Sequence, residues 1–319
     1  MQHKPGWLLA LLLTVFATGC SQERPLTVAM HPWLGYQSLP LAQQEGWISR
    51  DRVKLIHTKS STFSMQKLIN GKVDAAALTL DEAIQLRSEG EAVSAILVFD
   101  ISSGADVVLS RYKMEPLGEL PEITIGIEGN ALGSLMFAKF IETTGLERSK
   151  FKIINVTADQ HETFWNQNRA DMLITYEPMA SALIKKGAIR ISDTRSMANA
   201  VFDVLVVRND VMKGMDGELL HLLQGHFKAV QHIQGNQDDA YYRISALTGL
   251  TRGEVSAFYK GMILPNFEYN IELMAGSPGQ LQVYSERLGQ LLEREGFIAS
   301  YDSSELVNSD YANRLMRGQ

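Results

Sequence analysis

Short apolar runs alternate with helical patterns over the first third of the chain. Three of these runs have the length and composition of buried β-strands: residues 26–30, 53–58 and 73–78. Residues 39–44 and 63–70 between them have apolar positions at helical spacing and precede Gly46 and Gly71. Thr79 followed by Glu82 is a capping-box pattern, which predicts a further helix that ends at Gly90. Strands alternating with helices predict a mostly parallel sheet.

The same order of elements recurs 97 residues later. Residues 26–30 align with the apolar run 123–127, Asp74 aligns with Asp171, and Gly90 aligns with Gly187. Thr157 followed by Gln160 is again a capping-box pattern. Thr79 aligns with Tyr176, which opens a helical segment whose Pro178 suits the first turn. We interpret the pattern as two similar β-α-β-α units; the alternative is a chance likeness between two βαβ stretches.

Two further segments connect the units. Strand-like apolar runs occur in residues 95–110 and in residues 192–207. We interpret both segments as crossings of the chain between two lobes. From residue 218 onward the apolar positions have helical spacing, whereas residues 308–319 are polar and are predicted to fray. The predicted fold class is therefore α/β, with two lobes, each a mostly parallel sheet flanked by helices, and a helical C-terminal region.

The first 19 residues have the pattern of a lipoprotein signal peptide. His3 and Lys4 precede the apolar run 7–16, which is too short to span a bilayer. Small residues then precede Cys20, the only cysteine of the chain. We expect lipid attachment at Cys20, followed by a tether over residues 20–24; the alternative is an ordinary cleaved signal peptide with an incidental cysteine.

Composition and motifs exclude several classes of function. The chain has 36 Asp and Glu against 30 Lys and Arg and no basic run, so nucleic acid is not an expected partner. The nucleophile-elbow, zinc-protease and dithiol motifs are all missing. His221 and His226 are five residues apart, which does not suit a helical metal site. We expect no catalytic residue, no cofactor and no metal.

Ligands of open α/β sheets bind beyond the carboxyl ends of the strands. The polar and aromatic residues predicted at these ends are the candidate ligand-binding residues: Trp33, Tyr36, Ser60, Ser61, Thr62, Thr79, Asp81, Asp100, Ser102, Glu128, Asn130, Thr157, Tyr176, Glu177 and Asp203. For Thr79 and Thr157 the alternative is a helix cap alone, and for Trp33 and Tyr36 it is a packed turn.

Five segments in order resemble one protein family. They are PWLGYQSLPLAQQEGW (residues 32–47), GKVDAAALTLDEAIQL (71–86), FDISSGADVVLS (99–110), ADMLITYEPMASALIKKG (170–187) and LLEREGFI (291–298). Together they resemble the bacterial periplasmic solute-binding proteins of the nitrate, sulfonate, taurine and thiamine-precursor type, which serve ABC importers.

The resemblance implies a two-lobed, type II periplasmic-binding-protein fold that closes on a ligand. Residues 25–107 and 203–319 would form the first lobe and residues 108–202 the second. The implied protein is a monomer on the periplasmic side of a bacterial membrane, inner or outer, with a small-molecule ligand and an ABC permease as partners. Two alternatives are a ligand-binding partner of a membrane signalling receptor and an enzyme like the thiamine-pyrimidine synthase.

The candidate residues favour one kind of ligand. Many of them are acidic, and only Lys59 lies near them as a cation. Because a buried anion beside unpaired carboxylates is unfavourable, we expect a small ligand with an amine or heteroaromatic nitrogen. Aromatic rings such as Trp33 and Tyr36 suit a cationic or flat molecule.

Overall fold

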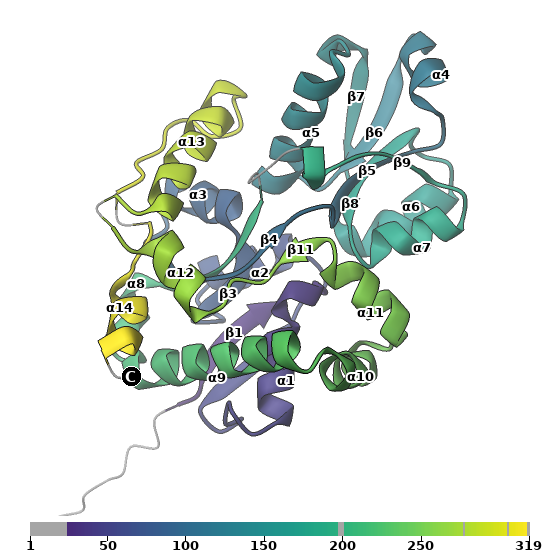
Figure 1. Ribbon diagram of the computed structural model, residues 1–319. Coiled ribbons are helices and arrows are strands. Elements are labelled where there is room, and N and C mark those ends of the chain that lie inside the picture. The colour runs from purple at the N-terminus through teal and green to yellow at the C-terminus, as the bar shows by residue number, and fades with distance from the viewer. Residues whose placement is uncertain (1–23, 197–200, 277, 305, 318–319) are drawn as a thin grey trace, which may run out of the picture.

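The computed structural model describes residues 24–196, 201–276, 278–304 and 306–317. These residues form two β-sheets surrounded by helices (Figure 1). The predicted signal peptide and Cys20 lie outside the described residues. Within the described ranges, no helix has both the length and the apolar character needed to cross a bilayer.

The first sheet has the strand order β11-β4-β10-β3-β1-β2 and the second has the order β7-β6-β8-β5-β9. The strands of the first sheet are β1 (Leu26–Met30), β2 (Val53–His57), β3 (Ala75–Thr79), β4 (Val93–Ser102), β10 (Phe202–Arg208) and β11 (Met262–Ile263). The strands of the second are β5 (Asp106–Ser110), β6 (Ile123–Ile127), β7 (Phe151–Asn155), β8 (Met172–Tyr176) and β9 (Ile189–Asp193). Only β10, β11 and β5 run against the other strands of their sheets, which confirms the predicted mostly parallel α/β fold.

Helices cover the sheets and build the C-terminal region. Those before β10 are α1 (Ser38–Gln44), α2 (Ser61–Ile69), α3 (Leu80–Ser88), α4 (Met114–Glu119), α5 (Ala131–Thr144), α6 (His161–Asn166) and α7 (Met179–Lys185), with the short 3₁₀ turns η1 (Leu34–Gln37), η2 (Arg148–Lys150), η3 (Ala158–Gln160) and η4 (Thr194–Ser196). Those after β10 are α8 (Asn209–Met212), α9 (Asp216–Gly235), α10 (Gln237–Thr248), α11 (Arg252–Tyr259), α12 (Phe267–Met274), α13 (Gln280–Arg294) and α14 (Asp310–Arg317).

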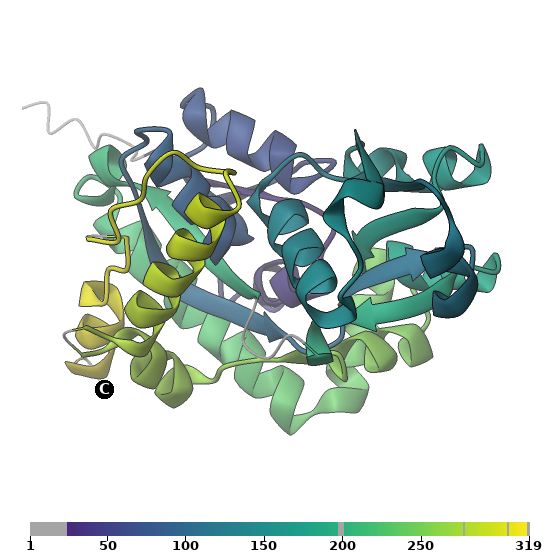
Figure 2. The same cartoon turned by 90° about the horizontal axis from the view of Figure 1, so that it is seen from above.

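Both faces of the first sheet are buried. Val28 packs into a core shared with α1 and α9, whereas its neighbour Ala29 packs into a second core with α2 and α3. This alternation follows from the two-residue period of a strand. Figure 2 shows, from above, the two sheets side by side with helices around them.

The repeat is confirmed by strand pairing and by a shared hydrogen bond. Val28 pairs with Ala75 in the first sheet, and Ile125 pairs with Met172 in the second, so both partners are offset by 97 residues. The Asp74 carboxylate accepts a hydrogen bond from the N–H of Thr27 at 2.9 Å. The Asp171 carboxylate accepts the corresponding bond from Thr124 at 2.8 Å.

Three local predictions need correction. Thr157 does not form a capping box, because its hydroxyl donates to Asp159 at 2.7 Å and helix α6 begins only at His161. Pro178 lies at the N-cap of α7 rather than in its first turn. The polar tail does not fray throughout, because residues 310–317 form α14, which buries Tyr311 and Leu315 four residues apart on one face.

Candidate functional site

The candidate residues gather where the two sheets meet. Asn130, which follows β6 of the second sheet, donates hydrogen bonds to Ser61 at 2.9 Å and to Glu82 at 2.8 Å, both on the first-sheet side. The N–H of Ala131 donates to Gln85 of α3 at 3.0 Å. Glu128 accepts two bonds from Thr62, one from its hydroxyl and one from its N–H at 3.3 Å. These bonds connect the N-terminal ends of α2, α3 and α5 across the junction.

Four aromatic side chains line the same junction. The Trp33 ring meets the Tyr176 ring edge to face, with centroids 5.8 Å apart. His31 lies against both Tyr36 and Tyr176, at 5.2 and 5.7 Å. All four side chains are buried. Burial lowers the pKa of His31 to about 3, so the His31 ring is neutral. Trp33 and Tyr36 are thus packed side chains of the turn that follows β1. The Trp33 indole N–H and the Tyr36 hydroxyl each point to a carboxylate.

Those carboxylates are Asp100 and Asp203. The Trp33 Nε1–H donates to Asp100 Oδ2 at 3.0 Å, and the Tyr36 hydroxyl donates to Asp203 Oδ1. Gly35 makes this approach possible, because a Cβ atom there would lie 1.7 Å from Asp100 Oδ2. A side chain at position 35 would push the turn away from the carboxylate.

The junction is unusually rich in buried acids. Its buried carboxyl groups belong to Asp81, Glu82, Asp100, Asp106, Glu128, Glu177 and Asp203. Among the described residues, only Arg190 forms an ion pair with any of them, at 3.1 Å from Glu177. Burial raises the pKa of Glu82 to about 7 and that of Asp106 to about 6. Burial and the neighbouring Glu82 also raise the pKa of Asp81 well above its ordinary value.

Several buried oxygen atoms of the acids and of their neighbours Tyr176 and Ser60 have no hydrogen-bond partner in the described part of the chain. They are both carboxylate oxygens of Asp81, Oδ1 of Asp100, Oδ2 of Asp106, Oε2 of Glu128, the hydroxyl of Tyr176 and the hydroxyl of Ser60. Buried polar atoms in folded proteins nearly always have a partner. Their concentration at one junction indicates a surface shaped to receive a donor.

Other candidate residues serve the scaffold. The Ser102 hydroxyl contacts Thr194 Oγ1 at 2.8 Å and accepts from the N–H of Asp106 at 3.2 Å, so it links the two crossing segments. Thr79 is the N-cap of α3, as predicted, and its N–H donates to Glu82 at 3.0 Å. Glu177 accepts from the N–H of Ser181 at 2.9 Å and thereby caps the start of α7.

A small cavity of about 20 Å³ remains beside the acids, between Asp106, Glu128, Tyr176 and His161. It has room for about one water-sized molecule. His161 Nε2 faces the Val156 carbonyl and must donate to it, so Nδ1 accepts from Thr175 at 3.0 Å. This histidine is neutral, and burial lowers its pKa to about 4. A ligand larger than a few atoms requires the two sheets to move apart.

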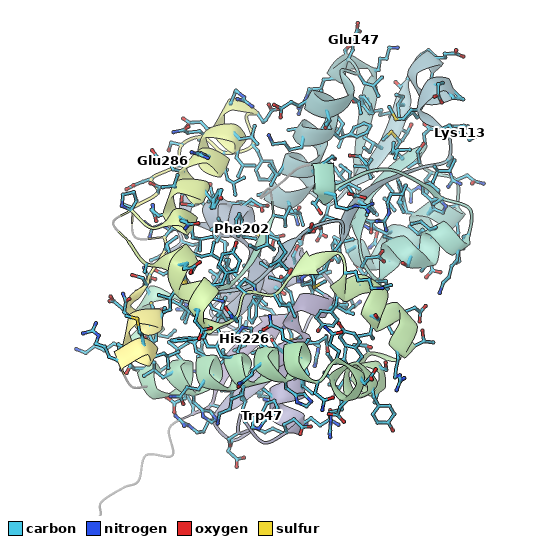
Figure 3. The ribbon with its side chains drawn as sticks, in the orientation of Figure 1. Trp47, Lys113, Glu147, Phe202, His226 and Glu286 are labelled. Carbon is cyan, nitrogen blue, oxygen red and sulfur yellow. The ribbon has the colours of Figure 1, made fainter. Side chains whose placement is uncertain are left out.

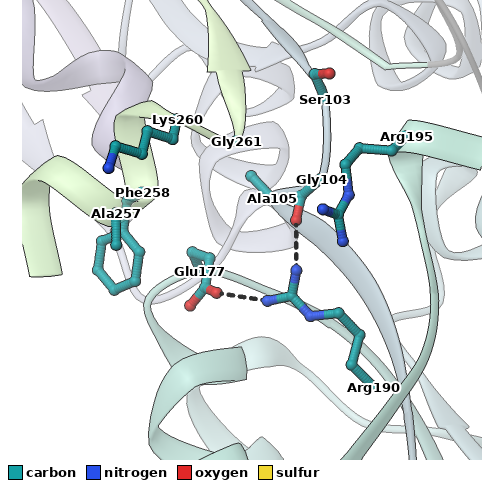
Figure 4. A pocket seen from close by; sticks show the side chains of 10 residues that line it. All are labelled: Ser103, Gly104, Ala105, Glu177, Arg190, Arg195, Ala257, Phe258, Lys260 and Gly261. Carbon is teal, nitrogen blue, oxygen red and sulfur yellow. Dashed lines mark hydrogen bonds and ion pairs between the residues drawn. The ribbon is translucent and has the colours of Figure 1, made fainter.

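A second pocket, of about 140 Å³, lies at the crossing between β4 and β5 (Figure 4). Arg190 spans it by donating to the Gly104 carbonyl at 3.1 Å and to Glu177 at 3.1 Å. Arg195 reaches in from η4, where it is paired with Asp193. Lys260 lines the other wall, next to the turn that leads into β11. The cations of the region thus lie at the crossing, beside the acidic group rather than within it.

Reasoning from the sequence missed part of this arrangement. Asp106 was within a polar stretch but was not a candidate, and Glu82 was assigned only to a cap. His31, which directly follows β1, and Arg190 were also missed. Position after a strand is a usable signal for His31. The role of Arg190 depends on a partner 13 residues away that only the folded sheet brings close.

Within the described residues, no group of three or more His, Cys, Asp or Glu side chains has the geometry to hold a metal ion. His221 accepts from the N–H of Ser49, whereas His226 contacts the Ser38 hydroxyl at 2.9 Å. These two histidines do not converge. Figure 3 shows His226 between α9 and the first sheet, and Phe202 near the middle of the molecule.

Comparison with known proteins identifies the family of this chain. The profile of the NMT1-like family matches residues 20–247, so the chain belongs to the NMT1-like family. No curated protein matches the chain in sequence. Solved structures that resemble the chain show that its fold is that of periplasmic binding proteins.

Three of these structures illustrate the likeness. The ligand-binding component of an ABC-type import system from Staphylococcus aureus, with zinc bound, has a TM-score of 0.76 at 11% identity, over 91% of this chain and 98% of that one. The alkanesulfonate-binding protein SsuA from Xanthomonas axonopodis pv. citri, bound to MOPS, has a TM-score of 0.71 at 12% identity, over 89% and 96%. The desulfurization enzyme DSZB has a TM-score of 0.65 at 15% identity, over 93% and 100%.

Proposed function

We propose that this chain is an extracytoplasmic solute-binding protein that encloses a small organic molecule with a positively charged or protonatable nitrogen. The observation that carries the proposal is the group of buried carboxyl groups with unpaired oxygens at the junction of the two sheets. A buried carboxylate oxygen is satisfied by an N–H donor and is most strongly satisfied by a charged one. An ammonium or a protonated ring nitrogen supplies both.

The same observation argues against an anionic ligand. A sulfonate at the junction would face Asp81, Asp100 and Asp106, and each of these acids that is ionised would repel it, which is strongly unfavourable out of water. Among the described cations, only Arg190 forms an ion pair with one of the buried acids of the junction. Its guanidinium is already bonded to Glu177 and to the Gly104 carbonyl. The chain thus shares the fold of the sulfonate-binding proteins and differs from them in proposed ligand charge.

Capture requires the lobes to separate and close. The chain passes between the sheets twice, from β4 to β5 and from β9 to β10, and these two crossings are the natural hinge. The closed arrangement is held by Asn130 and Glu128 on one side and by Ser61, Thr62 and Glu82 on the other. Because these residues surround the acids, the same movement that closes the lobes also encloses the ligand.

A thermal-shift screen of the purified protein tests the ligand class. We expect organic amines and protonatable pyrimidines to raise the melting temperature, because a ligand that binds only the folded form stabilises it. Sulfonates should leave it unchanged. Asp81→Asn should abolish the shift, whereas Asp51→Asn, which removes an equal charge from an exposed loop, should preserve it. Tight sulfonate binding without amine binding would falsify the proposed ligand class.

The partner and location follow from the proposed role. We propose that the protein delivers its ligand to an ABC permease, acts as a monomer and is anchored on the periplasmic side of the membrane by lipid on Cys20. Cells with an Asp81→Asn chromosomal variant should lose uptake of the ligand. A transcriptional response lost without any change in uptake would instead indicate a signalling receptor as partner.

The lipid anchor has its own test. Wild-type protein should incorporate a clickable fatty acid and sediment with membranes, whereas Cys20→Ser should do neither. Ser21→Ala is the matched control, because it alters the neighbouring residue without removing the thiol. A wild-type protein that stays free of lipid would show that the first 19 residues are an ordinary signal peptide.

A further inference from the structure

Asp100 and Asp203 form a pair of buried acids at the centre of the junction. They are directly opposite each other on the antiparallel strands β4 and β10. Opposed residues on such strands place their Cβ atoms about 4.5–5.5 Å apart on the same face of the sheet. Asp100 has no exposed surface and Asp203 is 3% exposed. Each receives one aromatic donor, from Trp33 and from Tyr36, and Oδ1 of Asp100 has no partner.

No cation within the described residues forms an ion pair with either acid. The titratable groups around the pair are acids or neutral groups on every side: Tyr36 and His31 beside β1, Asp81 and Glu82 of α3, Asp106 of β5, Tyr259 of α11, and Glu128 and Tyr176 of the second sheet. Two buried carboxyl groups in such surroundings cannot both be ionised. A single proton on the pair would remove one of the two charges and supply a donor for the unpaired Oδ1 of Asp100.

We propose that Asp100 and Asp203 hold one proton between them in the free protein at neutral pH, and that a cationic ligand replaces this proton when it binds. The inference rests on the proposed function and goes beyond it, because it assigns the pair as the subsite for the ligand's charge. In the exchange one O–H bond of the pair breaks, the proton passes to solvent, and the ligand's N–H group donates to the freed oxygen. The charge at the junction is conserved.

The electrostatics of the pair support this exchange. Burial, together with the nearby Asp106, raises the pKa of Asp100 to about 7. Burial and the charge of Asp100 raise the pKa of Asp203 well above its ordinary value. Below pH 7 the ligand must compete with a bound proton, so its affinity should fall about tenfold for each pH unit. The dependence should flatten above the pH at which the free pair itself releases the proton.

The shared proton can be tested without any ligand. Protein labelled with ¹³C at the aspartate carboxyl carbons is titrated by NMR from pH 4 to 9. The resonances of Asp100, Asp203, Asp81 and Asp106 are assigned with single Asp→Asn variants, because burial raises the pKa of all four. We expect the Asp100 resonance to be still titrating near pH 7 and to titrate at lower pH in Asp203→Asn, where an amide replaces the second acid. Asp51→Asn should leave the Asp100 titration unchanged. Ionisation of every aspartate below pH 5 would overturn the inference and leave the proposed function standing.

Calorimetry with benzylamine, which carries a ring and an ammonium, tests the exchange. Binding at pH 7 is measured in phosphate and in Tris, because the difference in enthalpy between the buffers counts the protons released. We expect about one proton per benzylamine for the wild type and close to none for Asp203→Asn. Binding without proton release overturns the exchange. Failure of benzylamine to bind counts against the amine class itself, while the NMR titration still decides the shared proton.

Discussion

The Glu128 carboxylate of the second sheet accepts hydrogen bonds from both the hydroxyl and the N–H of Thr62, at the start of α2. The bond joins two segments 66 residues apart and crosses the junction where the ligand is proposed to bind. Glu128 is buried, and its other oxygen, Oε2, has no partner. Glu128 thus holds the junction closed through Oε1, while Oε2 remains available to a ligand.

We expect Thr62→Val to favour the open arrangement. Valine keeps the shape and the N–H but removes the hydroxyl, and a hydrogen bond to a charged group contributes about 1.5–3 kcal/mol. The closed form should lose roughly that amount relative to the open form. Small-angle scattering should show a larger radius of gyration. Thr163→Val, at an exposed position of α6, is the matched control, and identical scattering from both variants would contradict the prediction.

The repeated Thr–Asp contact should stabilise each sheet separately. Asp74 accepts from Thr27, and Asp171 accepts from Thr124, at the start of equivalent strands. Asp74→Ala and Asp171→Ala should each lower the free energy of unfolding by about 1–3 kcal/mol. The two effects should add, because the sites lie in different sheets. Urea unfolding measures both; an effect no larger than that of Asp51→Ala would sink this account of the repeat.

Gly35 should tolerate no side chain. A Cβ atom there would meet Asp100 Oδ2 at 1.7 Å and Trp33 Nε1 at 2.6 Å, so Gly35→Ala must break the bond between these two residues. We expect a loss of at least 2 kcal/mol in the free energy of unfolding and a red-shifted, more exposed tryptophan fluorescence. Gly253→Ala in α11 meets nothing within 4 Å and should be neutral or slightly stabilising. Equal stability of the two variants would refute the close approach.

The strands were predictable because local patterns specify them. β1 and β6 have the predicted bounds, since each is an apolar run between polar residues. The third run was displaced: residues 73–78 were predicted, but β3 is Ala75–Thr79. Asp74 bonds to Thr27 on the neighbouring strand, and such a long-range contact has no local signal. α14 was missed because two buried side chains among polar residues are a weak pattern in isolation.

The site was predictable only in outline. Placing polar residues after strands found Asp81, which follows β3 at the carboxyl edge of the sheet. It also found Asp100 and Asp203, although Asp100 lies within β4 and Asp203 lies at the start of β10, whose antiparallel direction brings its first residues to that same edge. No local pattern indicates that Asp100 and Asp203 face each other, since their pairing depends on the insertion of β10 between β3 and β4. Position alone also could not separate Ser102, which links the crossings, from residues whose oxygens stay unpaired.

The protein should become less stable as the pH rises from 4.5 to 7. Burial raises the pKa of Asp106 to about 6 and that of Glu82 to about 7, whereas both ionise near pH 4 in the unfolded chain. Between these values the folded protein holds protons that the unfolded chain has released. Each proton held by an acid makes the free energy of unfolding fall by about 1.4 kcal/mol per pH unit. The buried histidines His31 and His161, whose pKa values are lowered to about 3 and 4, act in the opposite direction up to about pH 6.5, but the buried acids outnumber them.

Calorimetric melting from pH 4.5 to 8 measures this slope. Asp106→Asn cannot ionise, so its slope should be shallower up to about pH 6 and should match that of the wild type above it, where Asp106 is ionised in both states. Asp106 is the residue of choice because its Oδ2 has no partner that the substitution would disturb. Asp51→Asn should follow the wild type throughout. Equal slopes for Asp106→Asn and the wild type below pH 6 would contradict the prediction, because they would mean that Asp106 is already ionised in the folded protein.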